Sequence, residues 1–456
     1  MAELRSLESL LPAGRVLTDP ADCVAYSFDN SRRSERPWAV VLAHSEAEIQ
    51  TLVRWCASEG RALTVRGRGT NTVGATVPEP GGVVLSLERM QKVLEYSPAD
   101  RSITVEAGCL NQMVQAHCAA DGLFWPPDPT SAAYSSIGGN LGCNAGGPRA
   151  VRYGTCRDNT LGLRAVLGDG RLIRVGSRTT KSVVGLDLTR LLIGAEGTLG
   201  IITAATLKLS PLPQAKRTVR AEFGSVAAAA RAVSALLSQP EIPAVCEFLD
   251  DSAVGLIRSE VPLQSNTQAI LLLEAHGAAE QLGPVCQGWK SSCPVAPTAW
   301  LESADPAGVV ELWQARKALS PKLRGLAPDK TNEDVVVPVS QIPRLVEAVR
   351  ALSERYGIPI VCFGHAGNGN LHVNLMYDRA NPAHATAHDD CLQAVFSAVM
   401  DCGGSLSGEH GIGLSKRDFV GLELDQDTLA AMWAVKKALD PYSILNPSKG
   451  LPPLKA

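Results

Sequence analysis

The sequence predicts an α+β protein with more than one domain, and three observations carry this prediction. The chain has 456 residues, which is enough for two or three domains with well-buried cores. Helical and strand patterns alternate along its first part, separated by glycine-rich turns. After residue 213 the composition changes to alanine-rich helices and short strands. We therefore expect a first domain over 1–213, an α+β domain over 214–402, and a segment over 403–456 that returns to the first domain.

Composition limits the partners and the compartment. The net charge is −3 and there is no basic block, so neither nucleic acid nor an anionic membrane is expected as the main partner. No apolar run approaches the roughly 20 residues that a membrane span needs, and the amino terminus lacks a long apolar segment. The twelve cysteines are scattered without a CxxC pair, which favours reduced thiols over a disulfide framework. A cytoplasmic protein is expected.

The first domain begins with a clear β-α-β pattern. An apolar strand is predicted over 38–43, and Ser45 with Glu48 three residues later has the spacing of a capping box. The helix that follows should end at Gly60, and the next strand should cover 62–65.

Two further pairs of elements are predicted with similar clarity. Strands over 161–167 and 171–175 flank Gly-Asp-Gly at 168–170, which is a hairpin turn signal. In the second domain, an amphipathic helix over 340–357 is followed by a strand over 358–363.

Two glycine-rich stretches indicate a site for an extended, phosphate-bearing cofactor. The turn RGRGTNTVGAT at 66–76 places Gly67, Gly69 and Gly74 in a pattern that is not GxGxxG, so a Rossmann fold is disfavoured. Residues 126–202 are rich in glycine, asparagine and other small residues. Backbone donors of such segments can reach a ligand without side chains intervening.

Together these motifs resemble the FAD-binding fold of vanillyl-alcohol oxidase and p-cresol methylhydroxylase. The resemblance rests on 66–75, on GGN at 138–140 and on EGTLGII at 196–202, among other matching stretches. It implies a two-subdomain FAD-binding domain and an α+β, ferredoxin-like cap domain. It assigns to FAD the residues Arg66, Gly67, Arg68, Gly69, Thr70, Asn71, Gly74, Pro127, Asp128, Ser131, Gly138, Gly139, Asn140, Asn144, Gly146, Gly147, Tyr153, Glu196, Gly200, Ile202 and Asn446. Because 66–76 and 126–202 contain no histidine, the flavin is expected to bind without a covalent link.

A second constellation lies near the carboxyl terminus. His365 and His372 flank a run of glycine and asparagine, and a hairpin there would bring both imidazoles together. Alternation along the second strand puts His372 and Asn374 on one side. Glu409, in a second glycine-rich stretch, is the candidate third ligand. Two histidines and a glutamate suit zinc with a position left open, and manganese, iron or cobalt would also be tolerated. Spacing alone leaves a pair of exposed loop histidines as an equal alternative.

The stretches HAGNGNLHVN at 365–374 and GEHGIGLSK at 408–416 resemble the signatures of FAD-linked D-2-hydroxyacid dehydrogenases. The resemblance implies that the two histidines and Glu409 bind the metal and that His410 is the general base. Asn368 stands where that family usually has Asp, and Ser448 stands where NPGK is more common. The resemblance assigns the substrate to Arg316, Ser320, Lys330 and Asn374. The acidic neighbours of Lys330 are expected to repel a dianion; they are Asp329, Glu333 and Asp334.

The sequence therefore predicts an FAD- and metal-dependent dehydrogenase that oxidises a D-2-hydroxy acid, with D-lactate favoured. His410 would take the hydroxyl proton while a hydride passes from Cα to flavin N5. Glycolate and D-2-hydroxyglutarate are the alternative substrates within the same family. A metallohydrolase and a non-catalytic flavoprotein subunit are the alternatives from other classes. A quinone, a cytochrome or an electron-transfer protein is the expected electron acceptor, and a homodimer is an expected assembly.

Overall fold

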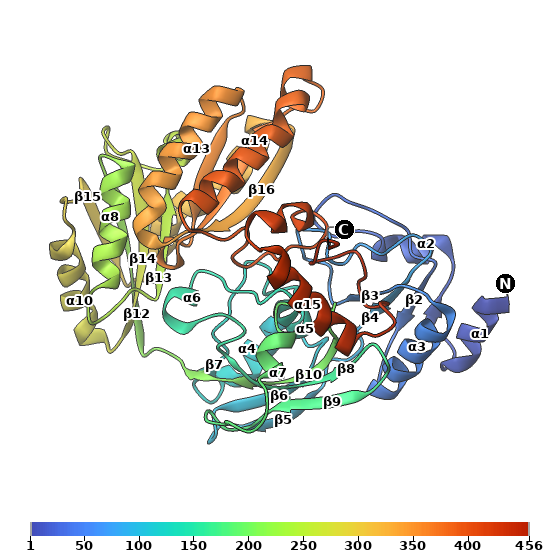
Figure 1. The fold of residues 1–456 in the computed structure, drawn as a ribbon. Coiled ribbons are helices and arrows are strands. Elements are labelled where there is room, and N and C mark those ends of the chain that lie inside the picture. Colours follow the sequence, from blue (N-terminus) through green and yellow to red (C-terminus); the bar gives the residue numbers. More distant parts are fainter. Residues whose placement is uncertain (1, 455–456) are drawn as a thin grey trace. The chain divides into compact units, whose positions relative to one another are not determined.

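The computed structural model describes residues 2–454, which divide into two compact units (Figure 1). The first unit contains the chain up to residue 147, residues 154–212 and the chain from residue 409. The second unit contains 148–153 and 213–408. The sequence argument placed the return to the first unit at 403, and it did not separate the short segment 148–153 from its surroundings.

The first unit begins with a four-stranded sheet in the order β1-β2-β4-β3, in which β2, β4 and β3 run parallel. Its strands are β1 (Val16–Leu17), β2 (Ala39–Leu42), β3 (Leu63–Arg66) and β4 (Val83–Ser86). Helix α3 (Glu46–Glu59) connects β2 to β3. The Ser45 side chain accepts the Glu48 N–H at 3.3 Å, and Gly60 ends the helix in the left-handed region with φ 64°. The predicted β-α-β unit, including its cap, is confirmed.

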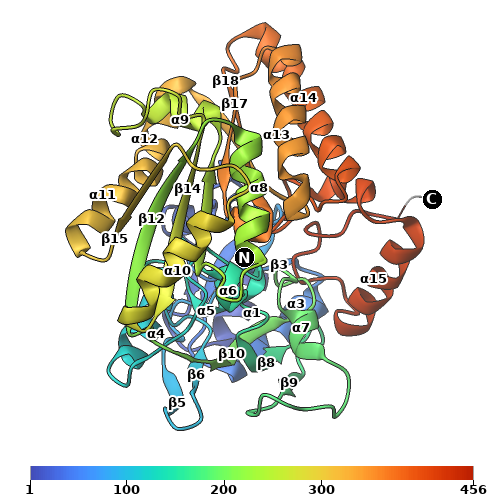
Figure 2. The same cartoon turned by 90° about the vertical axis from the view of Figure 1, so that its left-hand side faces the viewer.

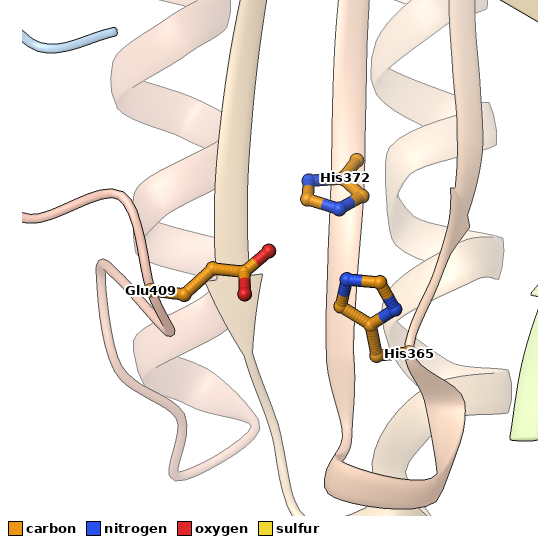
Figure 3. A group of neighbouring side chains, drawn as sticks. All are labelled: His365, His372 and Glu409. Atoms are coloured by element: carbon orange, nitrogen blue, oxygen red, sulfur yellow. The ribbon is translucent and has the colours of Figure 1, made fainter. Parts of the chain in front are cut away.

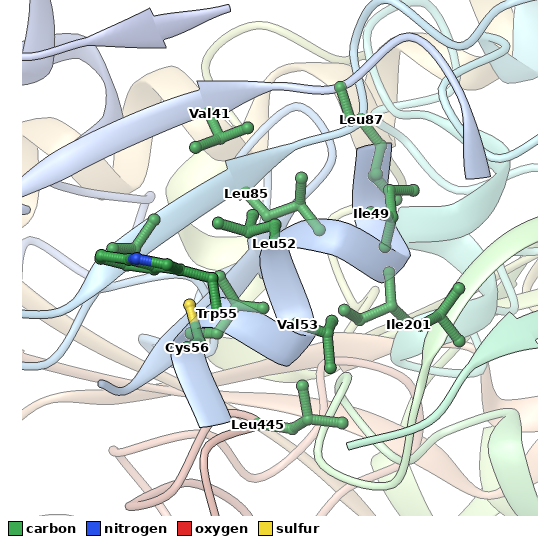
Figure 4. Packing of buried hydrophobic residues seen from close by; sticks show 14 of the residues in the cluster. Val41, Ile49, Leu52, Val53, Trp55, Cys56, Leu85, Leu87, Ile201 and Leu445 are labelled. Carbon is green, nitrogen blue, oxygen red and sulfur yellow. The ribbon is translucent and has the colours of Figure 1, made fainter. Parts of the chain in front are cut away.

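One face of α3 forms the core of this layer (Figure 4). Ile49, Leu52, Val53 and Cys56 recur at helical spacing and are fully buried. They pack in one cluster with residues of the sheet such as Leu85. Each fully buried aliphatic side chain contributes about 1.5–3 kcal/mol relative to its exposed state, so this face of α3 determines how the helix lies on the sheet.

The second layer of the first unit is a five-stranded antiparallel sheet in the order β5-β6-β10-β8-β9. Strands β8 and β9 form the predicted hairpin, with Gly170 at φ 81° in its turn. The strands are β5 (Val93–Ser97), β6 (Ser102–Glu106), β8 (Thr160–Val166), β9 (Leu172–Gly176) and β10 (Ile201–Lys208), with a separate short pair of β7 (Leu123–Phe124) and β11 (Ser210–Pro211).

Short helices and the carboxyl-terminal segment complete the first unit. They are α1 (Ala2–Leu10), α2 (Pro20–Cys23), η1 (Val24–Tyr26), α4 (Asn111–Ala119), α5 (Ile137–Gly142), α7 (Leu188–Leu192), η4 (Arg417–Leu422) and α15 (Gln426–Leu439). Lys436 on α15 forms a buried ion pair with Asp440 and donates to the carbonyl oxygens of Thr198 at 2.7 Å and Leu445 at 2.8 Å. This buried ammonium joins the terminal segment to the loop before β10.

The second unit is built on a seven-stranded sheet in the order β15-β12-β14-β13-β17-β18-β16. Its first four strands in chain order have the spatial order 4-1-3-2 with intervening helices, which is the ferredoxin-like arrangement that the sequence predicted. The strands are β12 (Ala215–Phe223), β13 (Val245–Leu249), β14 (Ala269–Gly277), β15 (Ala299–Ser303), β16 (Asp329–Val336), β17 (Ile360–Gly364) and β18 (Asn370–Tyr377).

Helices cover both faces of this sheet (Figure 2). One layer contains α8 (Val226–Leu237), α10 (Ala279–Ser292), α13 (Ile342–Tyr356) and α14 (Pro382–Asp401), and the other contains α9 (Asp251–Ile257), α11 (Pro306–Lys317) and α12 (Leu319–Leu326). The remaining elements are α6 (Ala150–Tyr153), η2 (Val339–Gln341) and η3 (Ala366–Asn368). The predicted amphipathic helix is α13, and Gly357 ends it with φ 65°.

The prediction of reduced thiols is confirmed. All twelve cysteines are free thiols, and most of them, including Cys56 and Cys362, are buried. No helix in residues 2–454 is both long enough and apolar enough to cross a membrane.

Candidate functional site

A cavity in the first unit is lined largely by the backbone of its glycine-rich loops. Of the residues assigned to FAD from the sequence, those that line it are Gly67, Arg68, Gly69, Thr70, Asn71, Ser131, Gly138, Gly139, Asn140, Glu196, Gly200 and Ile202. The cavity is also lined by residues of the two glycine-rich stretches that had not been assigned one by one: Thr72, Ala75, Thr76, Pro129, Thr130, Ser136, Gly142, Cys143, Ala145 and Gly197. Sequence reasoning missed Val65, Leu87 and Ala107, which lie outside both stretches.

Several glycines of the cavity wall have no room for a Cβ atom. A Cβ on Gly67 would lie 2.3 Å from Ser136 Oγ, and one on Gly138 would lie 2.7 Å from Ala107 Cβ. Asn71 fixes the first loop, because its Oδ1 accepts the N–H groups of Val73 at 2.9 Å and Ala75 at 3.1 Å. Rigid backbone with exposed N–H and hydroxyl groups suits the pyrophosphate of an extended cofactor.

Several residues assigned to FAD do not line this cavity, and their role in cofactor binding stays a prediction. They are Arg66, Gly74, Pro127, Asp128, Asn144, Gly146, Gly147, Tyr153 and Asn446. Arg66 is buried at the end of β3, and its guanidinium donates to the Phe28 carbonyl at 2.6 Å and to Ala25 and Thr76 at 3.3 Å. Its charge is therefore used to fix the preceding segment of the chain.

Others of this group hold loops in place. The Pro127 carbonyl accepts from Asn111 at 3.1 Å, and the Asn144 side chain accepts the Arg157 N–H at 2.9 Å. The Asp128 N–H donates to the Gly146 carbonyl at 3.2 Å. The Gly74 backbone adopts φ 80°, and a Cβ there would meet Leu414. Such residues belong to the same motifs as the cavity residues, which explains why sequence alone grouped them.

Tyr153 belongs to the second unit. Its hydroxyl lies 2.9 Å from Nδ1 of His276, whose Nε2 lies 3.2 Å from Glu274. Burial lowers the pKa of His276 despite the adjacent carboxylate. Tyr153 therefore anchors the segment 148–153 to β14.

Glu196 and Asn446 position the loop that carries His410. The Glu196 carboxylate accepts the N–H groups of Ile412 and Gly413, the latter at 2.8 Å, and burial raises its pKa. Asn446 donates to the Glu196 carbonyl at 2.6 Å. Neither contact was foreseen from the sequence.

Glu409 and His410 both line the cavity. The Glu409 carboxylate accepts the Gly147 N–H at 2.8 Å, and the His410 carbonyl accepts from Asn71 at 3.0 Å. The preceding residue, Gly408, donates its N–H to the Asp334 carbonyl on β16 at 2.9 Å. The expected general base therefore lies at the wall of the expected cofactor cavity.

The hairpin of β17 and β18 brings His365 and His372 together, as expected. Phe363 pairs with His372 in the sheet, and the two imidazole centroids are 5.2 Å apart with planes at 83°. One nitrogen of each ring and one carboxylate oxygen of Glu409 all lie within 4.8 Å of one another (Figure 3). Both histidines are buried, so the alternative of exposed loop histidines is wrong. Two imidazoles and a carboxylate at this spacing can hold a divalent metal ion.

Glu247 is a member of this site that sequence reasoning missed. Its carboxylate bonds to Nδ1 of His365 and accepts from Nε of Arg316 at 3.1 Å. The Arg316 guanidinium carbon lies 4.4 Å from the centre of the Phe363 ring. Burial raises the pKa of Glu247, but His365 and Arg316 outweigh it and hold the pKa at about 2. The available signal was a single acidic residue within the apolar strand VCEFL.

The register between β16 and β18 arranges the candidate substrate residues. Lys330 lies opposite Met376, and Asp334 lies opposite His372. Because cross-strand partners share a face, Lys330 lies on the same face as His372 and Asn374. The Asn374 amide is buried and donates to carbonyl oxygens of neighbouring strand residues at 3.1 and 3.0 Å.

The structure bears on two sequence arguments about the substrate. Asp329 and Glu333 alternate with Lys330 along β16 and therefore point to the opposite face of the sheet; Asp329 instead accepts the Arg379 N–H at 3.1 Å. Of the three acidic neighbours, only Asp334, which lies opposite His372, shares the face of Lys330 and can repel an anion held there. Ser320 is exposed in α12, whereas Arg316 belongs to α11. The role of Ser320 in substrate binding stays a prediction.

Comparison with protein families identifies both halves of the chain. The FAD binding domain family matches residues 37–176, and the family of FAD linked oxidases, C-terminal domain, matches residues 212–450. Among solved structures, p-cresol methylhydroxylase is similar with a TM-score of 0.82 at 17% identity, over 99% of this chain and 96% of that chain. At this identity the likeness establishes the fold.

Curated relatives span nearly the whole chain. The glycolate oxidase subunit GlcD of Bacillus subtilis is 35% identical over 430 residues, which are 93% of this chain and 92% of the relative. A D-2-hydroxyglutarate dehydrogenase of Xanthomonas citri is 34% identical over 97% of this chain and 96% of the relative. The mitochondrial D-lactate dehydrogenase [cytochrome] of Arabidopsis thaliana is 30% identical over 91% of this chain and 74% of the relative.

Proposed function

The chain belongs to the FAD-linked oxidase family, and on this premise we propose that it is an FAD- and metal-dependent dehydrogenase of small D-2-hydroxy acids, with D-lactate as the first substrate. Family membership makes it an FAD-linked oxidoreductase of the glycolate, D-lactate or D-2-hydroxyglutarate type. The observation that carries the finer proposal is the cluster of His365, His372 and Glu409, with His410 next in the chain at the cavity wall.

The chain's own residues supply binding and proton transfer, while bound FAD supplies a two-electron acceptor and a bound divalent ion supplies a Lewis acid. His365, His372 and Glu409 would hold zinc, and manganese, iron or cobalt would be tolerated. His410 would accept the proton of the substrate hydroxyl, because imidazole exchanges protons near neutral pH. The glycine-lined loops would exclude water from the reacting centre by enclosing the cofactor.

Arg316 is the proposed partner of the substrate carboxylate. It is the cation tied to the histidine cluster through Glu247, and a guanidinium can bind a carboxylate through two parallel hydrogen bonds. One such cation is sufficient for a monocarboxylic acid, which supports D-lactate or glycolate.

A specific observation favours D-2-hydroxyglutarate as a second candidate. Lys330 lies on the same sheet face as His372 and is exposed, so its ammonium offers a second positive charge. A dicarboxylic acid would use both cations. Lys330→Ala should lower kcat/KM for the dicarboxylate by about 10-fold or more and change that for D-lactate little, because an unpaired anion loses a charge-assisted hydrogen bond.

The alternative function of a metallohydrolase has little support, because a metallohydrolase would not need the glycine-lined cavity that includes His410. The absence of histidine from 66–76 and 126–202 supports non-covalent flavin. Precipitation with acid should release the yellow colour into the supernatant. Flavin that stays with the protein pellet would show a covalent link.

The experiment that tests the proposed function is anaerobic reduction of the purified yellow protein by a panel of acids. D-lactate, glycolate and D-2-hydroxyglutarate are compared with L-lactate, and bleaching of the flavin absorbance is followed. We expect rapid bleaching by D-lactate and none by L-lactate. Preferential bleaching by D-2-hydroxyglutarate would replace the substrate, and no bleaching by any of the four would refute the proposal.

A further inference from the structure

Glu247 occupies an unusual place for a carboxylate. It lies within β13, between Cys246 and Phe248, and is 1% exposed. Each of its two oxygens has a separate cationic or imidazole partner, since Oε1 bonds to His365 and Oε2 accepts from Arg316. One buried side chain thus contacts a proposed metal ligand and the proposed carboxylate-binding residue.

The contact with His365 determines which ring nitrogen is available to a metal. Glu247 engages Nδ1, so Nε2 is the nitrogen that would coordinate a metal ion. In Figure 3 one nitrogen of the His365 ring points toward His372 and Glu409 while the other points away. A carboxylate behind a metal-binding imidazole fixes the ring's orientation and increases its basicity.

The contact with Arg316 fixes the orientation of the guanidinium, as the contact with His365 fixes that of the imidazole. Glu247 accepts from Nε, and the Phe363 ring lies under the guanidinium with 4.4 Å between the Arg316 Cζ and the ring centre. These two contacts fix the plane of the group. The two terminal amino groups then remain as the pair that binds a carboxylate through two hydrogen bonds.

Resting on the proposed function, we infer that Glu247 is a positioning residue that sets the spacing between the metal-binding imidazole and the carboxylate-binding guanidinium. Both groups are oriented by opposite oxygens of one carboxylate on a central strand. Metal affinity and substrate affinity therefore depend on the same side chain. An amide at this position replaces one of the two oxygens by an NH2 donor, so it cannot accept from both partners, which engage opposite oxygens.

The sheet contains a matched control. Glu274 on β14 lies on the same face as Glu247, since Val245 pairs with Glu274 and Glu247 pairs with Leu272. Its carboxylate also serves two partners, Trp313 at 3.1 Å and His276 at 3.2 Å. Both of these partners differ from those of Glu247. Loss of Glu274 should therefore affect stability without affecting metal or substrate.

The test compares Glu247→Gln with Glu274→Gln in the full-length holoenzyme. Zinc affinity is measured by competition with a chromogenic chelator, and KM and kcat are measured with D-lactate. Glu247→Gln should weaken zinc binding by about 10- to 100-fold and raise KM by about 10-fold. Glu274→Gln should change both quantities by less than about twofold, although it lowers Tm.

A double-mutant cycle separates the two effects. In an Arg316→Ala background, Glu247→Gln should raise KM no further and should still weaken zinc binding, because each oxygen acts through its own partner. If Glu247→Gln does not fold, Glu247→Met with Arg316→Met replaces the buried pair by apolar side chains, and the same loss of zinc affinity is expected.

The outcomes distinguish this inference from the function on which it rests. Wild-type protein that binds zinc stoichiometrically, with Glu247→Gln unchanged in zinc affinity and KM, would overturn the inference alone. Equal losses in Glu247→Gln and Glu274→Gln would also overturn it, by indicating a general effect of the sheet's buried carboxylates. Wild-type protein that binds no zinc would overturn the metal part of the proposed function and the inference together.

Discussion

The two units differ in what forms their candidate functional surfaces, which is backbone in the first unit and side chains in the second. In the first unit, backbone lines the cavity, and buried charges such as Lys436 and Glu196 hold segments of backbone in place. In the second unit, side chains project from one face of a sheet, and the buried charge of Glu247 holds the side chains of His365 and Arg316. A backbone surface admits a large, extended cofactor, whereas a side-chain surface presents localised charge to a small ligand.

This difference determines how each surface should respond to mutation. The backbone surface should be sensitive to added volume and insensitive to most changes of side-chain chemistry. The side-chain surface should be sensitive to the loss of a charge or of a ligand atom. The following four substitutions test this contrast.

The largest effect is expected for His372→Ala. Removal of a ligand from the cluster should abolish metal binding and lower turnover by about 10³-fold, because a Lewis acid contributes several kcal/mol to transition-state stabilisation. The flavin spectrum should be unchanged, since the cavity in the first unit does not contain His372. Metal content by mass spectrometry and steady-state rates measure both effects. Retention of stoichiometric metal would remove His372 from the ligand set.

The next largest effect is expected for His410→Ala. Loss of a general base should slow flavin reduction by about 10²-fold or more, while metal content stays at the wild-type level. Stopped-flow reduction under anaerobic conditions measures the rate. Loss of the metal in this variant would instead make His410 a ligand.

Arg316→Ala should weaken transition-state binding by about 2 kcal/mol. This is the lower end of the range for loss of one partner of a hydrogen-bonded charge pair. The Arg316 side chain is 21% exposed, so solvent screens part of its charge. The comparison of kcat/KM with that of Lys317→Ala, a residue on the exposed side of α11, isolates the effect. Equal values for both variants would contradict the assignment of Arg316.

The smallest effect is expected in the backbone-lined cavity. Gly138→Ala places a Cβ 2.7 Å from Ala107 Cβ and 3.0 Å from the Ala107 carbonyl oxygen, and such overpacking costs about 1–3 kcal/mol. FAD affinity should fall by about 10-fold, with zinc affinity unchanged. Gly288→Ala is the control, because a Cβ there meets no atom within 4 Å. Unchanged FAD affinity in Gly138→Ala would separate this wall from the cofactor.

Local signals predicted the elements of the fold well. The N-cap Ser45 and the C-cap Gly60 mark the start and the end of α3 in the sequence, and the turn residues 168–170 indicate the hairpin of β8 and β9. The seven-stranded order of the second unit was not predicted, because strand pairing over a long sequence separation leaves no local pattern.

The candidate site was predicted where its residues belong to compact motifs. His365 and His372 lie in one hairpin, so their proximity follows from local geometry. Glu247 precedes His365 by more than a hundred residues, and only the pairing of β13 with β17 brings the two together. Two of the acidic neighbours of Lys330, Asp329 and Glu333, were misjudged because adjacency in sequence was not separated from sharing a face of a strand.

The most direct test of the proposed cooperation between flavin and metal is a single-turnover experiment on one preparation in two states. The protein is stripped of metal by exhaustive chelation, half of it is reconstituted with zinc, and both halves are mixed anaerobically with D-lactate. The account predicts rapid bleaching of the flavin in the reconstituted half and bleaching slower by about 10³-fold in the stripped half, with identical flavin content. Equal rates in the two halves would contradict it.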